Sequence, residues 1–166
     1  YQSNHDLQKN KKFLDVKNQI ENYLNKKIKG RFIDKNSRGR FLIKNMWFVI
    51  MKKNHSMHQH FHPKSTLSGV MYLEIGKLNS GKLNILIPKY NKKKYEHQKL
   101  WDFQNVKTKM TDLRINNKIS FIKKKNYTFH PKTNDIIIFN SFFYHNVGHY
   151  SDKQDRVSLA WDAVYT

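Results

Sequence analysis

Residues 58–72 read HQHFHPKSTLSGVMY and place three histidines at alternating positions before Pro63. In an extended segment successive side chains point to opposite faces, so His60 and His62 share one face, and His58 continues it toward a rim. Two imidazoles that project in the same direction can bind one metal ion. We therefore treat His60 and His62 as candidate metal ligands, with a structural or surface role as the alternative.

The absence of cysteine restricts the chemistry of such a site, because a bound metal must then be held by nitrogen and oxygen ligands. At 166 residues the chain is long enough for one domain with its own core. It contains no apolar run of membrane-spanning length and no signal-peptide pattern, which predicts a cytoplasmic protein without a membrane partner. Because residue 1 is Tyr and not Met, we expect a longer natural polypeptide, and upstream domains stay an open question.

The formal net charge of +20 is the most unusual feature of the composition. Such a charge favours anionic partners, either nucleic acid or an anionic substrate. The lysines are nevertheless spread from Lys9 to Lys153, which is typical of a solvated lysine-rich surface, and the densest runs are Lys92–Lys94 and Lys123–Lys125. We expect a mild preference for an anionic substrate, and we rank nucleic acid below it.

Apolar residues recur every three or four positions from Phe13 to Ile28, which predicts one amphipathic helix, and Gly30 is the expected stop. Beyond it the pattern is that of β-strands, separated by turn signals such as Asn79-Ser80-Gly81 and Thr133-Asn134-Asp135. Many short strands after a single helix predict a mainly β fold, an antiparallel sandwich or barrel. The predicted strands are 41–51 (one strand or a pair), 67–75, 83–87, 119–122, 136–139, 144–147 and 157–164.

One soft boundary, near 30–39, divides the chain into an N-terminal helical segment, 1–35, and a β domain, 36–166. We expect the helical segment to pack on the barrel. Between 89 and 118 the pattern loosens into a Lys-, Tyr- and Asn-rich stretch that is too long for an ordinary connection. Its aromatic residues Tyr95, Trp101 and Phe103 could form a lid over a substrate or an ordinary packed excursion.

The C-terminal region offers a second group of candidate site residues, within FNSFFYHNVGHYSDKQDRVSLAWDAV at 139–164. It holds a third histidine, His145, and a following strand on which Arg156 and Ser158 alternate onto one face. A guanidinium fork beside a hydroxyl fits a carboxylate. The chain turns between 148 and 152 and can return both groups to one cavity. A metal site and a carboxylate clamp are therefore predicted to be neighbours.

An iron(II) ion with positions left open for a bidentate keto acid and oxygen is a well-known use of this combination. The segments HFHPKSTLSGVMYLEI and HNVGHYSDKQDRVSLAWDAV resemble a family of 2-oxoglutarate/Fe(II)-dependent oxygenases in the prolyl-hydroxylase-like superfamily. Its members carry HxHP, then LSGVYYL, a distal His and an RxSxxFD ending. The resemblance covers roughly residues 46–163. It implies a double-stranded β-helix, the jelly-roll barrel that cupins also share, and here an N-terminal α-helix would precede it.

The resemblance also implies roles for single residues. Arg156 and Ser158 would bind the C5 carboxylate of 2-oxoglutarate, and Tyr72 occupies the place of a tyrosine whose hydroxyl contacts the same carboxylate in related enzymes. Asp162 matches the closing acid of the family and would either support the metal ligands or form a structural salt bridge. The implied iron ligands, which are also the catalytic residues, are His60, His62 and His145.

His62 departs from the wider superfamily, where most enzymes have a carboxylate at this position. Three neutral imidazoles leave the double charge of the metal uncompensated until the dianionic keto acid binds. Such a donor set also suits zinc, copper and nickel, so the identity of the metal stays open. His130 and His149 are the alternative ligands if one of the three assignments is wrong.

The implied function is that of an Fe(II)- and 2-oxoglutarate-dependent dioxygenase, a hydroxylase of a C–H bond that releases succinate and CO2. Its co-substrate is O2, and ascorbate would support turnover in vitro. One alternative is a cupin-like metal-binding protein, or a dioxygenase that does not use 2-oxoglutarate. Another is a basic nucleic-acid-binding module on an inactive barrel. The sequence does not distinguish a peptide side chain, a small metabolite and a nucleic-acid base as substrate, nor does it give the oligomeric state.

Overall fold

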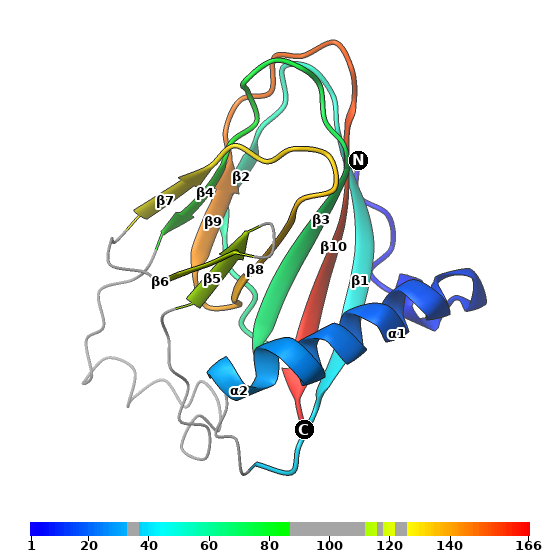
Figure 1. The fold of residues 1–166 in the computed structure, drawn as a ribbon. Helices are drawn as coiled ribbons and strands as arrows, with labels where there is room; N and C mark the ends of the chain where they lie inside the picture. Colours follow the sequence, from blue (N-terminus) through cyan, green and yellow to red (C-terminus); the bar gives the residue numbers. More distant parts are fainter. Residues whose placement is uncertain (33–36, 87–111, 116–117, 122–125) are drawn as a thin grey trace.

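The computed structural model describes residues 1–32, 37–86, 112–115, 118–121 and 126–166. Within these ranges the strands form two antiparallel sheets, one of order β1-β10-β3-β8-β5-β6 and one of order β2-β9-β4-β7 (Figure 1). The two sheets and the preceding helix confirm the predicted mainly β, jelly-roll fold class. The strands are β1 Phe41–Met51, β2 Met57–His60, β3 Leu67–Glu74, β4 Leu83–Leu86, β5 Asp112–Ile115, β6 Lys118–Phe121, β7 Asn126–Phe129, β8 Ile136–Asn140, β9 Tyr144–Val147 and β10 Arg156–Tyr165.

Most predicted strands agree with the observed ones to within one or two residues. Phe41–Met51 is one long strand and not a pair, and Tyr144–Val147 is found as predicted. The short strands β5 and β7 were not predicted, and β5 lies inside the 89–118 stretch that we expected to be irregular. Several predicted features lie outside the described residues: Ile87, Lys92–Lys94, Tyr95, Trp101, Phe103, Ile122 and Lys123–Lys125.

The N-terminal helical segment begins earlier than its apolar periodicity predicts. Two 3-10 turns, η1 Leu7–Lys9 and η2 Lys11–Phe13, precede helix α1, Leu14–Tyr23. The chain then widens into a π-helical stretch, η3 Leu24–Ile28, and continues as α2, Lys29–Phe32. The expected stop at Gly30 is therefore wrong, since the helix continues past this residue. The division into 1–35 and 36–166 stays a prediction.

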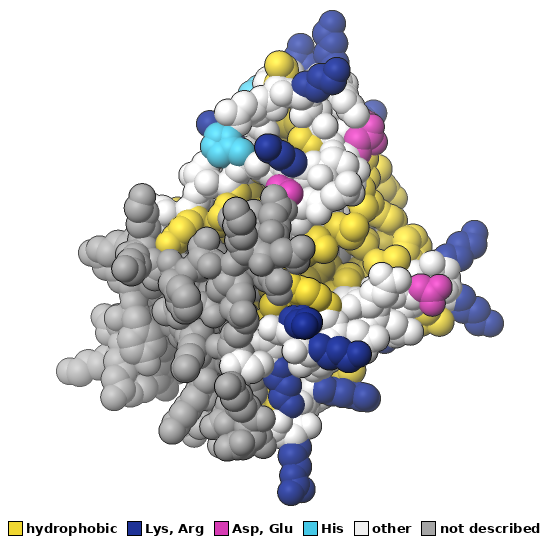
Figure 2. All heavy atoms as spheres, viewed as in Figure 1, with side chains coloured by type: hydrophobic (Ala, Val, Ile, Leu, Met, Phe, Trp, Pro, Cys, Tyr) yellow, Lys and Arg dark blue, Asp and Glu magenta, His cyan; other side chains and the backbone are white. Residues whose placement is uncertain are grey.

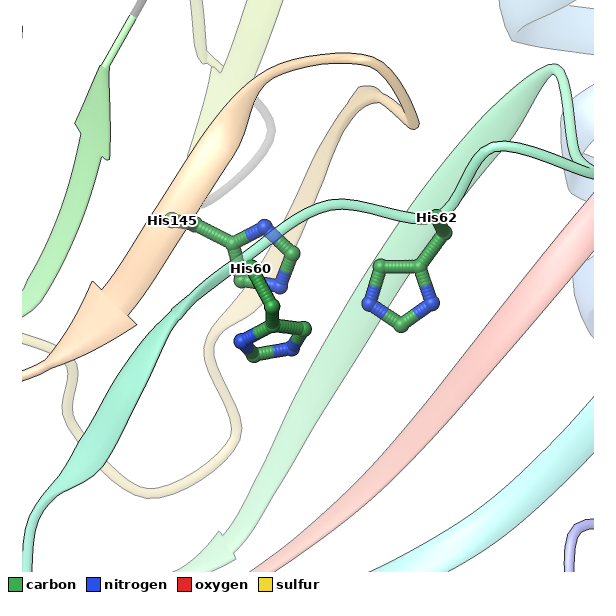
Figure 3. A group of neighbouring side chains, drawn as sticks. All are labelled: His60, His62 and His145. Carbon is green, nitrogen blue, oxygen red and sulfur yellow. The ribbon is translucent and has the colours of Figure 1, made fainter.

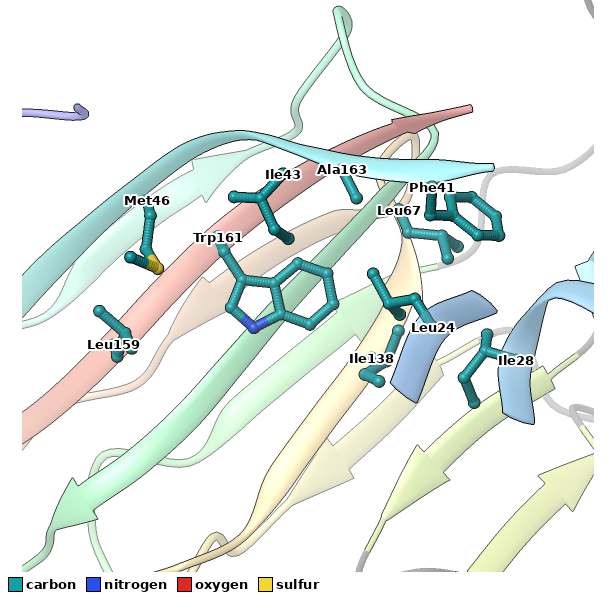
Figure 4. Packing of buried hydrophobic residues seen from close by; sticks show 10 residues of the cluster. All are labelled: Leu24, Ile28, Phe41, Ile43, Met46, Leu67, Ile138, Leu159, Trp161 and Ala163. Carbon is teal, nitrogen blue, oxygen red and sulfur yellow. The ribbon is translucent and has the colours of Figure 1, made fainter. Parts of the chain in front are cut away.

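The helical segment lies across the outer face of the larger sheet (Figure 1). Leu24 and Ile28 are fully buried and pack with Trp161 of β10 in a cluster between helix and sheet (Figure 4). On β3 a glycine, Gly69, faces this indole, and a Cβ at this position would lie 2.0 Å from Trp161 Cζ2. The remaining members of this outer core are Phe41, Ile43, Met46, Leu67, Ile138, Leu159 and Ala163.

A second core fills the space between the two sheets. Because strand side chains alternate, Ile137 and Phe139 of β8 point into this space whereas Ile138 points to the helix. The other buried members of this inner core are Met51, Tyr72, Leu83, Ile85, Phe129, Phe143, Val147 and Tyr150. The inner face of the large sheet is therefore the one that can present polar groups to an enclosed site.

Strand β1 forms one edge of the large sheet, and the N-terminal residues cover this edge. Gln2 forms a β-bridge with Val49, and the Gln8 side chain donates to the Lys44 carbonyl at 2.6 Å and accepts from Met46 N–H at 3.1 Å. The pairing of β1 with β10 shifts register between Ile43 and Asn45, and Ile43 and Met46, on either side of this shift, both pack in the outer core. Covering an edge in this way protects it from pairing with other chains.

No helix in the described part of the chain is both long and apolar enough to cross a membrane. On the face shown in Figure 2, the Lys and Arg side chains are scattered over the described surface and do not gather into one patch. This distribution agrees with a solvated lysine-rich surface.

Candidate active site

Three histidines lie close together, one from β2, one from the segment that follows it and one from β9 (Figure 3). His60 ends β2 and pairs directly with His145 of β9, and His62 follows two residues after His60. The backbone N–H of His62 donates to the Ser141 carbonyl at 2.8 Å, which fixes the segment after β2. One ring nitrogen from each histidine lies within 4.8 Å of the other two. The structure therefore brings together the three histidines that the sequence singled out.

The three rings share a hydrogen-bonding pattern that leaves one nitrogen of each available. Nδ1 of His60 lies 2.8 Å from the His58 carbonyl, and Nδ1 of His145 lies 3.1 Å from the Phe143 carbonyl. Nδ1 of His62 lies 3.0 Å from Oδ2 of Asp162. Because a carbonyl or carboxylate oxygen only accepts, each Nδ1 carries a proton, and Nε2 is left as the ring nitrogen that can bind a metal. This is the tautomer that a metal ligand needs.

Burial keeps two of these rings neutral. Desolvation lowers the pKa of His145 to about 3, and the nearby His60 ring adds to this effect. Desolvation also lowers the pKa of His60, with a smaller contribution in the same direction from His62. Neutral imidazole is the form that binds metal, so His145 stays competent as a ligand well below neutral pH, and the lowered pKa of His60 acts in the same direction.

A cavity extends from the histidines into the space between the sheets, with a total volume of about 500 Å³ that includes its open mouth. Arg156, Ser158 and Tyr72 line the same cavity. The strand register explains this placement, because Ser158 of β10 lies opposite Tyr72 of β3 and opposite Val49 of β1. The predicted neighbourhood of histidines and arginine is thus present.

Arg156 is 2% exposed, and no carboxylate of the described residues forms a salt bridge with it. Its guanidinium lies over the Tyr72 ring, 4.8 Å from the centroid, and its Nε has no hydrogen-bond partner among the described residues. The Tyr72 hydroxyl is also buried; it interacts with the nearby Arg156 guanidinium but forms no hydrogen bond within 3.5 Å among the described residues. Burial raises the pKa of Tyr72, against the opposing effect of the Arg156 charge, so the phenol stays protonated and can donate.

The remaining candidate histidines stay outside this group. The His58 side chain is exposed and contributes only its carbonyl to the His60 ring. His130 is exposed and pairs with the Asn79 side chain, and His149 is exposed. The alternatives to the three-histidine set therefore have no support in the structure.

Asp162 forms a hydrogen bond with one of the three clustered histidines. Its Oδ2 accepts from His62, and its Oδ1 accepts from Ser68 Oγ at 2.7 Å. Of the two roles expected for this acid, the structure places it as the partner of a histidine in the candidate ligand set. Ser68 was not singled out from the sequence, although it shares a strand face with Tyr72, four residues along.

Trp47 is a second residue that the sequence did not place at the site. Its indole lies 5.7 Å from the His62 ring, centroid to centroid, and the His5 ring stacks on the same indole at 4.3 Å. Phe139 packs against His145 at 4.8 Å between centroids. Aromatic residues thus form the walls around the imidazoles, and the N-terminal segment contributes to them.

A family model described as "Putative 2OG-Fe(II) oxygenase" matches residues 45–162, well over half of the chain. No curated protein matches the chain significantly. The residues matched by the family model include all three clustered histidines, together with Arg156, Ser158, Tyr72 and Asp162.

Solved structures show the same fold at low sequence identity. HygX from Streptomyces hygroscopicus, with nickel and 2-oxoglutarate bound, has a TM-score of 0.58 at 8% identity. The match covers 98% of this chain and 71% of the HygX chain. A Pseudomonas putida prolyl-4-hydroxylase has a TM-score of 0.51 at 14% identity, and the match covers 92% of this chain and 64% of the hydroxylase chain. A Burkholderia pseudomallei oxidoreductase of the 2OG-Fe(II) oxygenase family has a TM-score of 0.50 at 14% identity, and the match covers 78% of this chain and 47% of the Burkholderia chain.

The chain spans about half of the Burkholderia protein and just under two thirds of the hydroxylase. These likenesses support the double-stranded β-helix assignment, and the family match adds the sequence evidence. The chain therefore belongs to the 2-oxoglutarate- and Fe(II)-dependent oxygenases, a family of oxidoreductases.

Proposed function

We propose that this chain is an Fe(II)- and 2-oxoglutarate-dependent dioxygenase in which His60, His62 and His145 hold the metal. Three neutral imidazoles with free Nε2 lone pairs suit a borderline metal such as iron(II). Their Nδ1 partners fix each ring in position before a metal arrives, which lowers the cost of binding. The family to which the chain belongs supplies the choice of iron over zinc, copper or nickel.

One observation carries the proposal: a buried guanidinium without an anionic partner in the described residues shares a cavity with the three imidazoles. Burying an unpaired charge costs several kcal/mol, so such a group indicates a missing anion. We propose that Arg156 binds the C5 carboxylate of 2-oxoglutarate, with Tyr72 and Ser158 as hydroxyl donors. Among the described residues, the Ser158 hydroxyl has only a long 3.5 Å contact to the Val49 carbonyl and is free to turn to a ligand.

When bound, Fe(II) and 2-oxoglutarate would supply the oxidation of a C–H bond by O2, with release of succinate and CO2. The protein would hold the distal end of the keto acid at Arg156 and direct its other end toward the imidazoles. Apolar groups such as Val70, Phe139 and Trp47 line the cavity and limit the access of water. This arrangement would keep the reacting atoms in register and suppress side reactions.

The substrate class is a peptide side chain or a small metabolite. The prolyl-4-hydroxylase among the structural neighbours makes a prolyl peptide the first candidate to screen. The net charge of +20 favours an anionic member of either class. Strong inhibition of turnover by added salt would support this preference, and salt-independent turnover would oppose it.

The test is succinate formation from 2-oxoglutarate with Fe(II) and ascorbate. Wild type should release succinate slowly alone and faster with a productive substrate, whereas His60→Ala should release none above background. His149→Ala is the matched control, because it removes an exposed histidine outside the cluster.

Metal binding without any effect of 2-oxoglutarate on thermal unfolding would contradict the proposal and favour a cupin-like metal protein. Salt-dependent binding to oligonucleotides without succinate formation would favour a nucleic-acid-binding module.

A further inference from the structure

The contact between His62 and Asp162 joins residues on two different segments, the one that follows β2 and the strand β10 of the large sheet. The Asp162 side chain is 5% exposed. Its two oxygens are each used once, Oδ2 by His62 Nδ1 and Oδ1 by Ser68 Oγ. No Lys or Arg of the described residues forms a salt bridge with it. This carboxylate is therefore committed to the histidine and not to a structural ion pair.

The charge balance of the occupied pocket indicates why a carboxylate beside His62 would matter for metal binding. A divalent metal and Arg156 together bring three positive charges into a largely buried cavity, and a 2-oxoglutarate dianion returns only two negative ones. Three neutral imidazoles add none. An uncompensated charge in such surroundings is costly, and the described residue that lines the cavity and carries a negative charge is Asp162.

We propose that Asp162 is a positioning residue that supplies, through His62, the negative charge that three imidazoles lack. This inference rests on the proposed function, because it assumes that His60, His62 and His145 bind the metal. A carboxylate on Nδ1 makes the imidazole a stronger electron donor at Nε2 and stabilises the metal electrostatically. Ser68 holds this carboxylate in place by occupying its other oxygen.

The Asp162→Asn variant separates the effect of Asp162 on the orientation of the His62 ring from the effect of its charge. Asn has the same shape as Asp, and in Asp162→Asn the amide oxygen can still accept from His62 Nδ1 while the NH2 faces Ser68 Oγ. The ring therefore keeps its orientation and loses only the charge behind it. If Asp162 acted only by orienting the ring, this variant would bind metal as wild type does.

The experiment measures the affinity of the whole protein for Ni(II), and anaerobically for Fe(II), by calorimetry in the absence of 2-oxoglutarate. We expect Asp162→Asn to bind both ions about 10- to 100-fold more weakly than wild type. Ser68→Ala, which leaves the charge but loosens its position, should give a smaller loss. Asp15→Asn is the matched control, since it removes one negative charge from the exposed face of α1 and should leave both affinities unchanged.

The Fe(III)/Fe(II) midpoint potential provides a readout that ring orientation alone would not move. Loss of a nearby negative charge should raise this potential in Asp162→Asn relative to wild type. Equal affinities and equal potentials in a folded Asp162→Asn, with wild type binding metal through its histidines, would overturn this inference and leave the proposed function intact. Wild-type affinity that survives His60→Ala would instead overturn both.

Discussion

Arg156 is the residue whose surroundings say most about what the cavity binds. Its side chain is buried over the Tyr72 ring, and its Nε and the Tyr72 hydroxyl form no hydrogen bond of ordinary length among the described residues. A fold rarely keeps such groups unless a ligand completes them. We therefore interpret this arginine as a group kept for a ligand and not for the stability of the protein.

Arg156→Met tests this interpretation, because it replaces the buried cation with an apolar side chain of similar length. The ligand-free protein should keep its free energy of unfolding or gain about 1 kcal/mol. Affinity of the Ni(II)-loaded protein for 2-oxoglutarate should fall by about 100-fold or more. Denaturant unfolding and calorimetric titration check the two halves. A large loss of stability, or retained keto acid affinity, would contradict the assignment.

Tyr72→Phe removes one hydroxyl from the same cavity and leaves the ring beneath Arg156 in place. Because this hydroxyl forms no hydrogen bond of ordinary length among the described residues, its loss should not destabilise the ligand-free protein. We expect 2-oxoglutarate to bind roughly 5- to 10-fold more weakly, the value of one hydrogen bond. Unchanged binding would show that the hydroxyl does not reach the keto acid.

At the scale of elements, the site depends on how three strands of the large sheet are held in register. β10 lies between β1 and β3, so one strand carries Arg156, Ser158 and Asp162 on its inner face and Trp161 on its outer face. The close packing of Trp161 on Gly69 fixes the spacing of β10 and β3 from the helix side. The outer core therefore supports the geometry of the inner site.

Gly69→Ala should destabilise the protein by about 2–3 kcal/mol, because the new methyl group would overlap the buried Trp161 ring. Gly148→Ala is the matched control, since the nearest atom to its Cβ lies 3.8 Å away, in ordinary contact. Denaturant unfolding of both variants provides the measurement. Equal stabilities would mean that the indole and the strand separate more easily than the packing indicates.

The sequence predicted features that depend on local periodicity and missed those that depend on register. Alternation alone placed His60 with His62 and Arg156 with Ser158. The hydrogen bond between His62 and Asp162 could not be predicted, because it joins residues 100 positions apart through the pairing of several strands. The register shift near Asn45 and the continuation of the helix through Gly30 were equally invisible, since packing and edge contacts override local propensity there.

At the scale of the whole molecule, the buried imidazoles make the stability of the metal-free protein depend on pH. An unfolded chain protonates its histidines near pH 6.5, whereas folded His145 resists protonation until about pH 3. Acid therefore favours the unfolded state through this window, and stability should fall by about 2 kcal/mol between about pH 7 and 5. The lowered pKa of His60 acts in the same direction.

Unfolding of the metal-free protein as a function of pH, compared with His145→Asn, measures this effect. The variant should show a shallower dependence, because it lacks the group that resists protonation. Identical pH profiles would indicate that His145 is more accessible to solvent than its burial suggests.

We propose above all that imidazoles from β2, from the segment that follows it and from β9 form one site for Fe(II) and 2-oxoglutarate with the guanidinium on β10. Anaerobic addition of 2-oxoglutarate to the Fe(II)-loaded protein tests it most directly, by the weak visible charge-transfer band of a chelated keto acid. The band should develop in wild type and in His149→Ala, and it should be absent in His145→Ala. No band in wild type, or a band that persists in His145→Ala, would contradict the account.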